Sequence, residues 1–224
     1  MTQERRERHG PTRLVLASAS PRRCELLAGL GLSFTVRPAA VDETPRAGED
    51  PAALVERLAR EKAAAVALPG ELVLAADTEV AIDGGALGKP ADATDAARML
   101  ALLAGRRHEV VTGVALLDAD RGRLAAGVER TQVLFAPLSP REIDWYVSSG
   151  EPMDRAGAYA IQGLGALLVR VVEGNYLNVV GLPLPLVYDL CRQLGVDLLS
   201  AVGAVDRLGG GRYVGTTAGK RGTR

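Results

Sequence analysis

Short apolar runs alternate along the chain with segments in which apolar residues recur every three or four positions. The runs are typical of buried β-strands and the spaced segments of amphipathic helices. Strands are predicted at residues 13–18, 34–38 and 71–77, and helices after Ser20 and over residues 51–68. The elements expected beyond them are a hairpin turning at Gly84–Gly85, a helix around 96–103, strands at 108–119 and 124–136, a helix opened by Ser139, strands at 158–162 and 166–174, and a last helix from Pro183 to Gly195. This alternation predicts an α/β fold with a curved mixed β-sheet flanked by helices, in two lobes that face a cleft.

The two ends of the chain offer little that a core could bury. Residues 1–12 are polar and basic, and residues 207–224 are rich in Gly, Arg and Thr. We therefore expect a flexible N-terminal tail over 1–12, one domain over 13–206 and a flexible C-terminal tail over 207–224.

Composition narrows the class of protein. Lysine plus arginine and aspartate plus glutamate number 27 each, so the formal net charge is zero. Proteins that gather nucleic acid carry a basic surplus, so we expect no nucleic-acid partner, and any anion site must be local. No apolar run approaches the ~20 residues that span a bilayer, which predicts a cytoplasmic protein without a membrane partner. Cys24 and Cys191 lack CxxC spacing, so neither a structural zinc site nor a disulfide framework is expected.

The start of the first helix contains a local contradiction. Ser20 suits the N-cap and Pro21 the first helical position, yet Arg22 and Arg23 fill the first turn. The helix dipole is positive there and disfavours each cation by roughly 0.3–1 kcal/mol. A bound phosphate would turn this repulsion into attraction, with the Ser18 and Ser20 hydroxyls as further donors. The alternative is that both arginines extend into solvent.

Acids and lysines elsewhere suit phosphate chemistry. Asp77 follows a five-residue apolar run, so we expect it at the end of a buried strand, at a sheet edge, where it would hold a divalent cation or orient water. The alternative is that it caps the next turn. Lys89 lies in a stiff turn nearby, and Lys62 lies in an apolar-faced helix from which it can reach inward. Glu43 adds an acid on a loop, and Asp42 could serve instead.

The sequence motifs of other catalytic classes are absent or incomplete. The chain has no GxxxxGK[ST], GxSxG or HExxH motif, and its two histidines are His9, in a tail, and His108, at the start of a strand, where a structural hydrogen bond is favoured. Gln162 carries a carboxamide that suits the reading of a base edge, although it also fits an ordinary strand. The residue types present therefore favour catalysis by carboxylates and a bound metal ion.

Four blocks carry these residues in order: LASASPRRCELL (16–27), AADTEVAIDGGALGKP (75–90), HEVVTGVALL (108–117) and DRAGAYAIQGLGALLVRVVEGNYLNVVGLPL (154–184). Together they resemble the Maf family of nucleotide pyrophosphatases over residues 13–199. The resemblance implies hydrolysis of nucleoside triphosphates between the α and β phosphorus atoms with a divalent cation, for which hard oxygen ligands favour Mg²⁺ over Mn²⁺ or Co²⁺. It also implies a fold similar to that of inosine triphosphatases, and it suggests a homodimer.

The resemblance assigns roles to individual residues. It implies that Asp77 is the catalytic proton acceptor for water. The pairing of ADT with AIQG resembles the branch that acts on dTTP and UTP, and modified pyrimidine triphosphates are further candidate substrates. Glu79 stands where the family usually has an apolar residue. The other implied roles are phosphate binding by Ser18, Arg23, Lys62 and Lys89, metal binding by Glu43 and Asp77, and base preference set by Arg22, Thr78 and Gln162.

An alternative from another class is a nucleotide-binding regulator of cell division that does not turn its ligand over. Such a sensor has no need of a water-activating acid. The joint presence of Asp77, Lys62, Lys89 and Arg23 therefore favours an enzyme.

Overall fold

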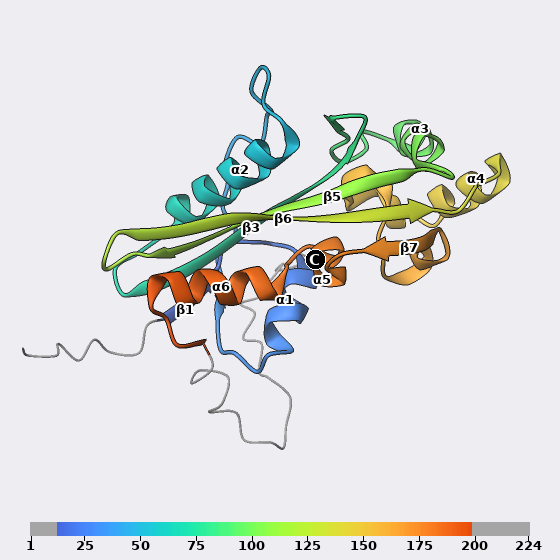
Figure 1. The fold of residues 1–224 in the computed structure, drawn as a ribbon. Helices are drawn as coiled ribbons and strands as arrows, with labels where there is room; N and C mark the ends of the chain where they lie inside the picture. The colour runs from blue at the N-terminus through green and yellow to red at the C-terminus, as the bar shows by residue number, and fades with distance from the viewer. Residues whose placement is uncertain (1–12, 199–224) are drawn as a thin grey trace, which may run out of the picture.

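A computed structural model describes residues 13–198, and the two expected tails, together with the predicted domain end at 206, lie outside the described residues. Seven strands form one sheet in the order β2-β1-β3-β5-β6-β7, with β4 paired to β3 (Figure 1). The strands are β1 (Arg13–Leu16), β2 (Thr35–Val36), β3 (Glu71–Ile82), β4 (Gly85–Ala86), β5 (Arg107–Asp118), β6 (Arg123–Phe135) and β7 (Val169–Glu173). Strand β1 runs parallel to β2 and β3, and the other pairs are antiparallel. The predicted mixed sheet is confirmed.

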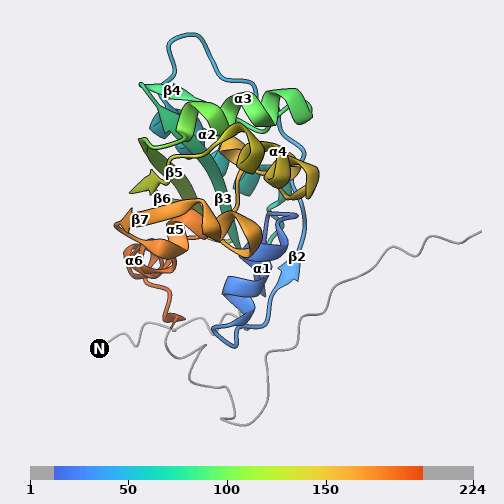
Figure 2. The same ribbon diagram turned by 90° about the vertical axis from the view of Figure 1, so that its right-hand side faces the viewer.

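Helices cover both faces of the sheet. The α-helices are α1 (Pro21–Ala28), α2 (Pro51–Val66), α3 (Ala93–Leu103), α4 (Pro140–Ser148), α5 (Tyr176–Val180) and α6 (Leu184–Leu194), and the short 3-10 helices are η1 (Glu151–Asp154), η2 (Ala156–Ala158) and η3 (Gly163–Leu167). Helix α2 lies on one face, α1 and α6 lie on the other, and α3 and α4 lie together at one end (Figures 1 and 2).

The alternation of side chains along β3 builds the layers. Leu72 and Leu74 pack with α1 and α6, whereas Val73 and Ala75 pack with α2, as the two-residue period of a strand requires. A separate cluster joins the far end of β3 to α3, α4 and the segment around Tyr159. The core therefore contains separate clusters, two on opposite faces of the sheet and one at its far end, while the two lobes expected from the sequence stay a prediction.

Strand β3 does not end at Asp77, so that prediction is wrong. The strand continues to Ile82 because Asp77, Thr78 and Glu79 pair in register with Gly113, Thr112 and Val111 of β5. Strand β1, by contrast, ends at Leu16 opposite Leu74. Asp77 therefore lies just past the end of the neighbouring strand, in mid-strand rather than at a strand end.

The hairpin after β3 turns one residue earlier than predicted. Ile82 pairs with Gly85, so the two turn residues are Asp83 and Gly84 rather than Gly84 and Gly85. Their φ angles are 53° and 80°, and this pair of left-handed residues suits the twist of a two-residue hairpin.

The predicted strand at 158–162 is also wrong, since η2 ends at Ala158, η3 begins at Gly163, and the residues between them form neither helix nor strand. Gly157 and Ala158 have φ angles of 66° and 58°, which a strand does not allow. The Gly157 N–H donates to the Gly88 carbonyl at 2.8 Å, and the Ala160 N–H donates to the Tyr146 hydroxyl at 3.1 Å. The strand predicted over 166–174 is confirmed only as the shorter β7.

Helix boundaries agree better with the sequence. The capping box of Ser139 and Glu142 opens α4 as predicted, and Gly195, with φ 70°, ends α6. Ser20 occupies the N-cap of α1, although its side chain makes no capping hydrogen bond. In the described part of the chain both cysteines are free, and no helix there is long and apolar enough to cross a membrane.

Candidate active site

A cleft of about 500 Å³ opens beside the end of β1. Its walls come from the β1–α1 turn, the middle of β3, the loop before α2 and the segment 154–161, which packs with α3 and α4. Gln162 is exposed and adjoins Ile161, which lines the cleft, but Gln162 itself does not line it. The residues that sequence reasoning selected and the fold brings into this cleft are Ser18, Arg22, Arg23, Glu43, Lys62, Asp77, Thr78 and Lys89.

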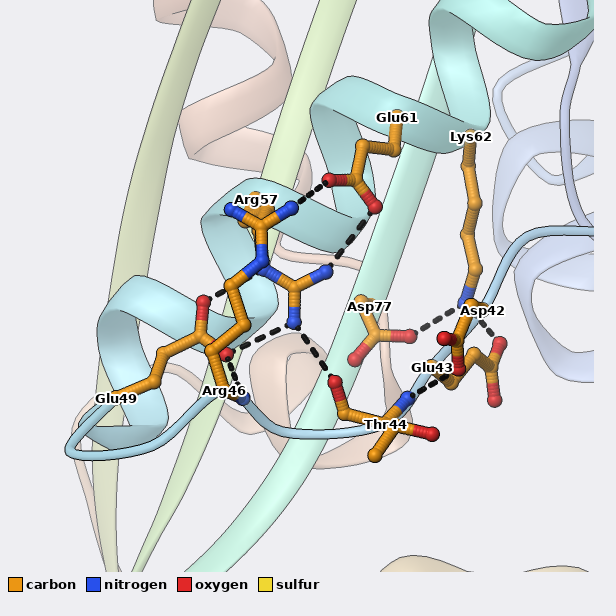
Figure 3. Close-up of polar contacts among 9 residues, drawn as sticks. All are labelled: Asp42, Glu43, Thr44, Arg46, Glu49, Arg57, Glu61, Lys62 and Asp77. Atoms are coloured by element: carbon orange, nitrogen blue, oxygen red, sulfur yellow. Dashed lines mark hydrogen bonds and ion pairs between the residues drawn. The ribbon is translucent and has the colours of Figure 1, made fainter.

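Lys62 connects two of the selected acids. Its Nζ lies 2.6 Å from Asp77 Oδ1 and 2.5 Å from Glu43 Oε1 (Figure 3). The side chains of Lys62 and Asp77 are only 9% and 11% exposed, while that of Glu43 is 51% exposed. Buried charges need a partner because desolvation is costly, so this lysine compensates the Asp77 carboxylate. The inward reach expected for Lys62 is confirmed.

A glycine allows α2 to bring Lys62 to Asp77. Gly113 pairs with Asp77 across the sheet. A Cβ added at Gly113 would lie only 2.2 Å from the Val55 carbonyl oxygen of α2. The absent side chain therefore permits the backbone of α2 to lie directly on β5 at the level of the acid.

The loop that carries Glu43 is tied to the same helix. Arg57 of α2 donates to both carboxylate oxygens of Glu49, at 2.6 and 2.8 Å, and to the Thr44 carbonyl at 3.2 Å (Figure 3). The Arg57 bonds lower the pKa of Glu49 to about 2. Asp42 accepts from the Thr44 N–H at 3.0 Å and stabilises the turn. Of the two acids left open by the sequence, Glu43 is thus the one that contacts Lys62.

Arg23 is bound mainly by the protein. Its guanidinium donates to the carbonyls of Gly181 and Ala76, at 2.7 and 2.8 Å, and to the hydroxyls of Thr78 and Ser18, at 2.9 and 3.2 Å. Burial lowers its pKa, while the Asp77 and Glu43 charges act in the opposite direction. Arginine has five N–H donors, so one remains for a ligand. Arg23 therefore joins α1 to β3 and α5, and its predicted contact with phosphate stays a prediction.

Glu79 is a half-buried third acid at a position where the family usually has an apolar residue. Its Oε2 accepts from the Gly88 N–H at 3.0 Å. Burial first, and then the charge of Asp77, raises the pKa of Glu79 to about 7. Glu79, Asp77 and Glu43 therefore form an acidic wall, although no group of three such side chains among residues 13–198 is arranged as a ready-made metal site.

The loop next to Gln162 is held by Glu151. This carboxylate accepts from the Tyr146 hydroxyl at 2.8 Å and from the N–H groups of Leu164 and Gly165 at 3.0 and 2.9 Å. These bonds hold the backbone that follows Gln162. Its role in base preference stays a prediction.

His108 is structural, as the sequence favoured. Its Nε2 lies 2.9 Å from the Tyr159 hydroxyl, and its ring packs edge-on against Phe135. Burial lowers the pKa of His108 to about 4, so the ring is neutral at pH 7.

Sequence reasoning missed Arg155, which lines the cleft. It lies in the quoted block DRAGAYAIQG, but a single charged residue before an alanine and a glycine carries no recognisable signal. Its position depends on the irregular backbone of η1 and η2.

Comparison with known proteins identifies relatives of the chain and its family. A dTTP/UTP pyrophosphatase of Moorella thermoacetica is 55% identical over 193 residues, which cover 85% of this chain and 100% of that protein. Proteins with the same name from Anaeromyxobacter dehalogenans strain 2CP-C and Myxococcus xanthus are 56% and 57% identical, covering 83% and 84% of this chain and 96% and 95% of their own. A solved HAM1 protein of Coxiella burnetii has a TM-score of 0.37 and 19% identity, over 55% of this chain and 73% of its own. The family described as Maf-like protein matches residues 13–194, and the chain therefore belongs to the Maf family.

Proposed function

We propose that this chain hydrolyses dTTP and UTP to the nucleoside monophosphate and pyrophosphate. The observation that carries the proposal is the Lys62 ammonium between Asp77 and Glu43 inside the cleft. Relatives that share more than half of their residues with this chain bear the name dTTP/UTP pyrophosphatase, which supports pyrimidine triphosphates as the substrates.

Asp77 is the general base in this proposal. It takes a proton from water while the water oxygen bonds to the α-phosphorus and the anhydride bond to the β-phosphate breaks. Pyrophosphate leaves with the electron pair. Lys62 binds one carboxylate oxygen of Asp77 at 2.6 Å and so orients the second. A positioned base contributes typically 10²–10⁴-fold to the rate.

Binding of the triphosphate relies on cations. Phosphoryl transfer is catalysed mainly by positioning and by charge neutralisation. The cations that line the cleft are Arg22, Arg23, Lys62, Lys89 and Arg155. Lys89 is exposed on its turn, which leaves its ammonium accessible to a ligand.

The acidic wall suits a divalent cation. Carboxylate oxygens are the ligands that Mg²⁺ prefers. Burial, and after it the charges of Asp77 and Glu43, raise the pKa of Glu79, and a cation would compensate these charges. We propose that Asp77 and Glu43 hold Mg²⁺, with Mn²⁺ or Co²⁺ as substitutes, and that Glu79 adds to the local negative charge. When bound, the ion would neutralise charge on the phosphate oxygens. A cytoplasmic location and a homodimer stay predictions.

Pyrophosphate release from a panel of triphosphates tests the function. With Mg²⁺, we expect release from dTTP and UTP and much less from dCTP, ITP or 7-methyl-GTP. Asp77→Asn should lower kcat by about 10²–10⁴-fold while dTTP still binds. Near-native turnover in this variant would remove Asp77 from the mechanism. Binding of dTTP to the unaltered protein without pyrophosphate release would instead favour the regulator of cell division.

A further inference from the structure

Two arginines that lie far apart in the sequence both line the cleft, from different segments of the chain. Arg22 lies in the first turn of α1, and Arg155 lies between η1 and η2. Both side chains line the cleft. Next to burial, the charge of Arg155 is the largest influence on Arg22, whose pKa falls to about 10. Two cationic side chains therefore approach each other closely.

Neither arginine is fully paired. Arg22 Nη1 and Arg155 Nε are buried and have no hydrogen-bond partner, and no ion pair within residues 13–198 involves either residue. An unsatisfied buried donor costs about 1–3 kcal/mol, more for a charged group. Buried polar groups of this kind call for an explanation such as a missing ligand.

The backbone holds Arg155 in this place. The Arg155 N–H donates to the Pro152 carbonyl at 3.1 Å, and the Gly157 N–H donates to the Gly88 carbonyl at 2.8 Å. A Cβ at Gly157, whose φ is +66°, would lie 2.8 Å from Val80. The segment therefore packs tightly on β3 and presents Arg155 from a fixed loop.

The missing partner must be an anion. A neutral carbonyl of a nucleobase would satisfy a donor but would leave the repulsion between the two guanidinium groups. A phosphate does both, because its oxygens accept forked hydrogen bonds and its charge compensates both cations.

We propose that Arg155 is a substrate-binding residue that, together with Arg22, binds the part of the triphosphate that leaves as pyrophosphate. The inference rests on the proposed function, in which the anhydride bond between the α- and β-phosphates breaks next to Asp77. Arg23 contacts Ala76 and Thr78 on either side of Asp77 and is influenced by the Asp77 and Glu43 charges, whereas the charges acting on Arg22 are those of Arg155, Arg23, Glu25 and Asp154. The β- and γ-phosphates are then held at a distance from the acidic wall.

The test compares Arg155→Met, Arg155→Lys and the control Arg141→Met. Arg141 is an exposed arginine of α4 that does not line the cleft. For Arg155→Met we expect the dissociation constant of inorganic pyrophosphate, measured by calorimetry, and the KM for dTTP to rise tenfold or more. The kcat should change less than threefold, Arg155→Lys should recover part of the loss, and Arg141→Met should match the unaltered protein.

Two results would overturn the inference. One is a folded Arg155→Met protein that keeps the pyrophosphate affinity within twofold. The other is unchanged pyrophosphate affinity with a lost preference for dTTP over dCTP, which would make Arg155 a reader of the base. Should Arg155→Met fail to fold, the same comparison with Arg155→Lys decides. Calorimetry needs no turnover, so a failure of the proposed enzymatic activity is recognised separately, in the unaltered protein.

Discussion

At the scale of single residues, the site depends on one lysine that serves two acids. Lys62 is buried in α2 and donates to Asp77 while it also contacts Glu43. Removing one member of a buried pair leaves an uncompensated charge, which costs more than the pair contributes. The same side chain therefore stabilises the fold and orients the proposed base.

Lys62→Met is expected to lower the free energy of unfolding by about 3 kcal/mol, because the Asp77 carboxylate stays buried without a partner. Pyrophosphate release from dTTP should fall at least 10²-fold. The control is Lys89→Met: Lys89 is exposed, so its loss should change stability by less than about 0.5 kcal/mol. Urea unfolding at pH 7 measures the stability of both variants. Equal stability losses in the two variants would contradict the role given to Lys62.

His108 makes stability depend on pH. Its pKa is about 4 in the folded protein against an ordinary value of 6.5, so below pH 6.5 the unfolded chain binds a proton that the folded chain does not. The free energy of unfolding therefore falls as the pH decreases, by about 2 kcal/mol between pH 7 and 5. Well above pH 7, His108 is neutral in both the folded and the unfolded chain, so it no longer makes the free energy of unfolding depend on pH.

His108→Gln should lose this part of the pH dependence and keep the part that carboxylates cause. Urea unfolding of both proteins at pH 7, 6 and 5 provides the comparison. The same slope in both proteins would show that another group is responsible.

At the scale of elements, the placement of α2 on the sheet creates the site. The helix lies against β3 and β5 (Figure 1), and at Gly113 its backbone occupies the space that a side chain would fill. Because Gly113 pairs with Asp77, the backbone of α2 lies close to the sheet at the level of the acid that Lys62 reaches.

Gly113→Ala should shift α2 away from the sheet, since the new Cβ would lie 2.2 Å from the Val55 carbonyl oxygen. Overpacking of this kind costs about 1–3 kcal/mol, and a misplacement of about 1 Å at a site can cost 10²-fold in rate. Thermal unfolding and kcat/KM for dTTP are the measurements.

The control for that substitution is Gly85→Ala in β4, where the nearest atom to a new Cβ is the Ile82 carbonyl oxygen at 3.8 Å. This variant should resemble the unaltered protein in both stability and activity. If Gly113→Ala retained full activity, the close approach of α2 would not be needed for the site.

At the scale of the whole molecule, the cleft lies between segments that belong to different clusters of the core. One wall belongs to the β1–α1 turn, and the other belongs to the segment 154–161, which packs with α3 and α4. A ligand that contacts both walls binds only the folded chain and therefore stabilises it.

For Asp77→Asn, which we expect to bind dTTP and to turn it over far more slowly, dTTP at a hundredfold excess over its dissociation constant should raise the free energy of unfolding by about 2.7 kcal/mol. For a domain of this size that raises Tm by roughly 5–10 °C. Thymidine at the same concentration, which lacks the phosphates, should raise Tm far less. Scanning fluorimetry with Mg²⁺ present measures the shifts, and equal shifts would mean that the phosphates do not contribute to binding.

Much of this architecture follows from local pattern. Apolar runs and helical spacing suffice for β1, β5, β6, α2 and α6, and the capping box at Ser139 suffices for the start of α4. The pattern fails where polar residues belong to a strand. Asp77, Thr78 and Glu79 look like a strand end, yet the backbone hydrogen bonds of β5 extend β3 through them.

The amino-acid sequence is enough to assign the α/β class, most elements and eight residues of the cleft, because each of these depends on neighbours within a few positions or on the family motifs. Three-dimensional packing alone selects Glu43 over Asp42 as the partner of Lys62, commits most of the Arg23 donors to the protein, and brings Arg155 to Arg22. These are contacts between side chains far apart along the chain. Their geometry follows from how the helices and loops lie on the sheet, which no local pattern encodes.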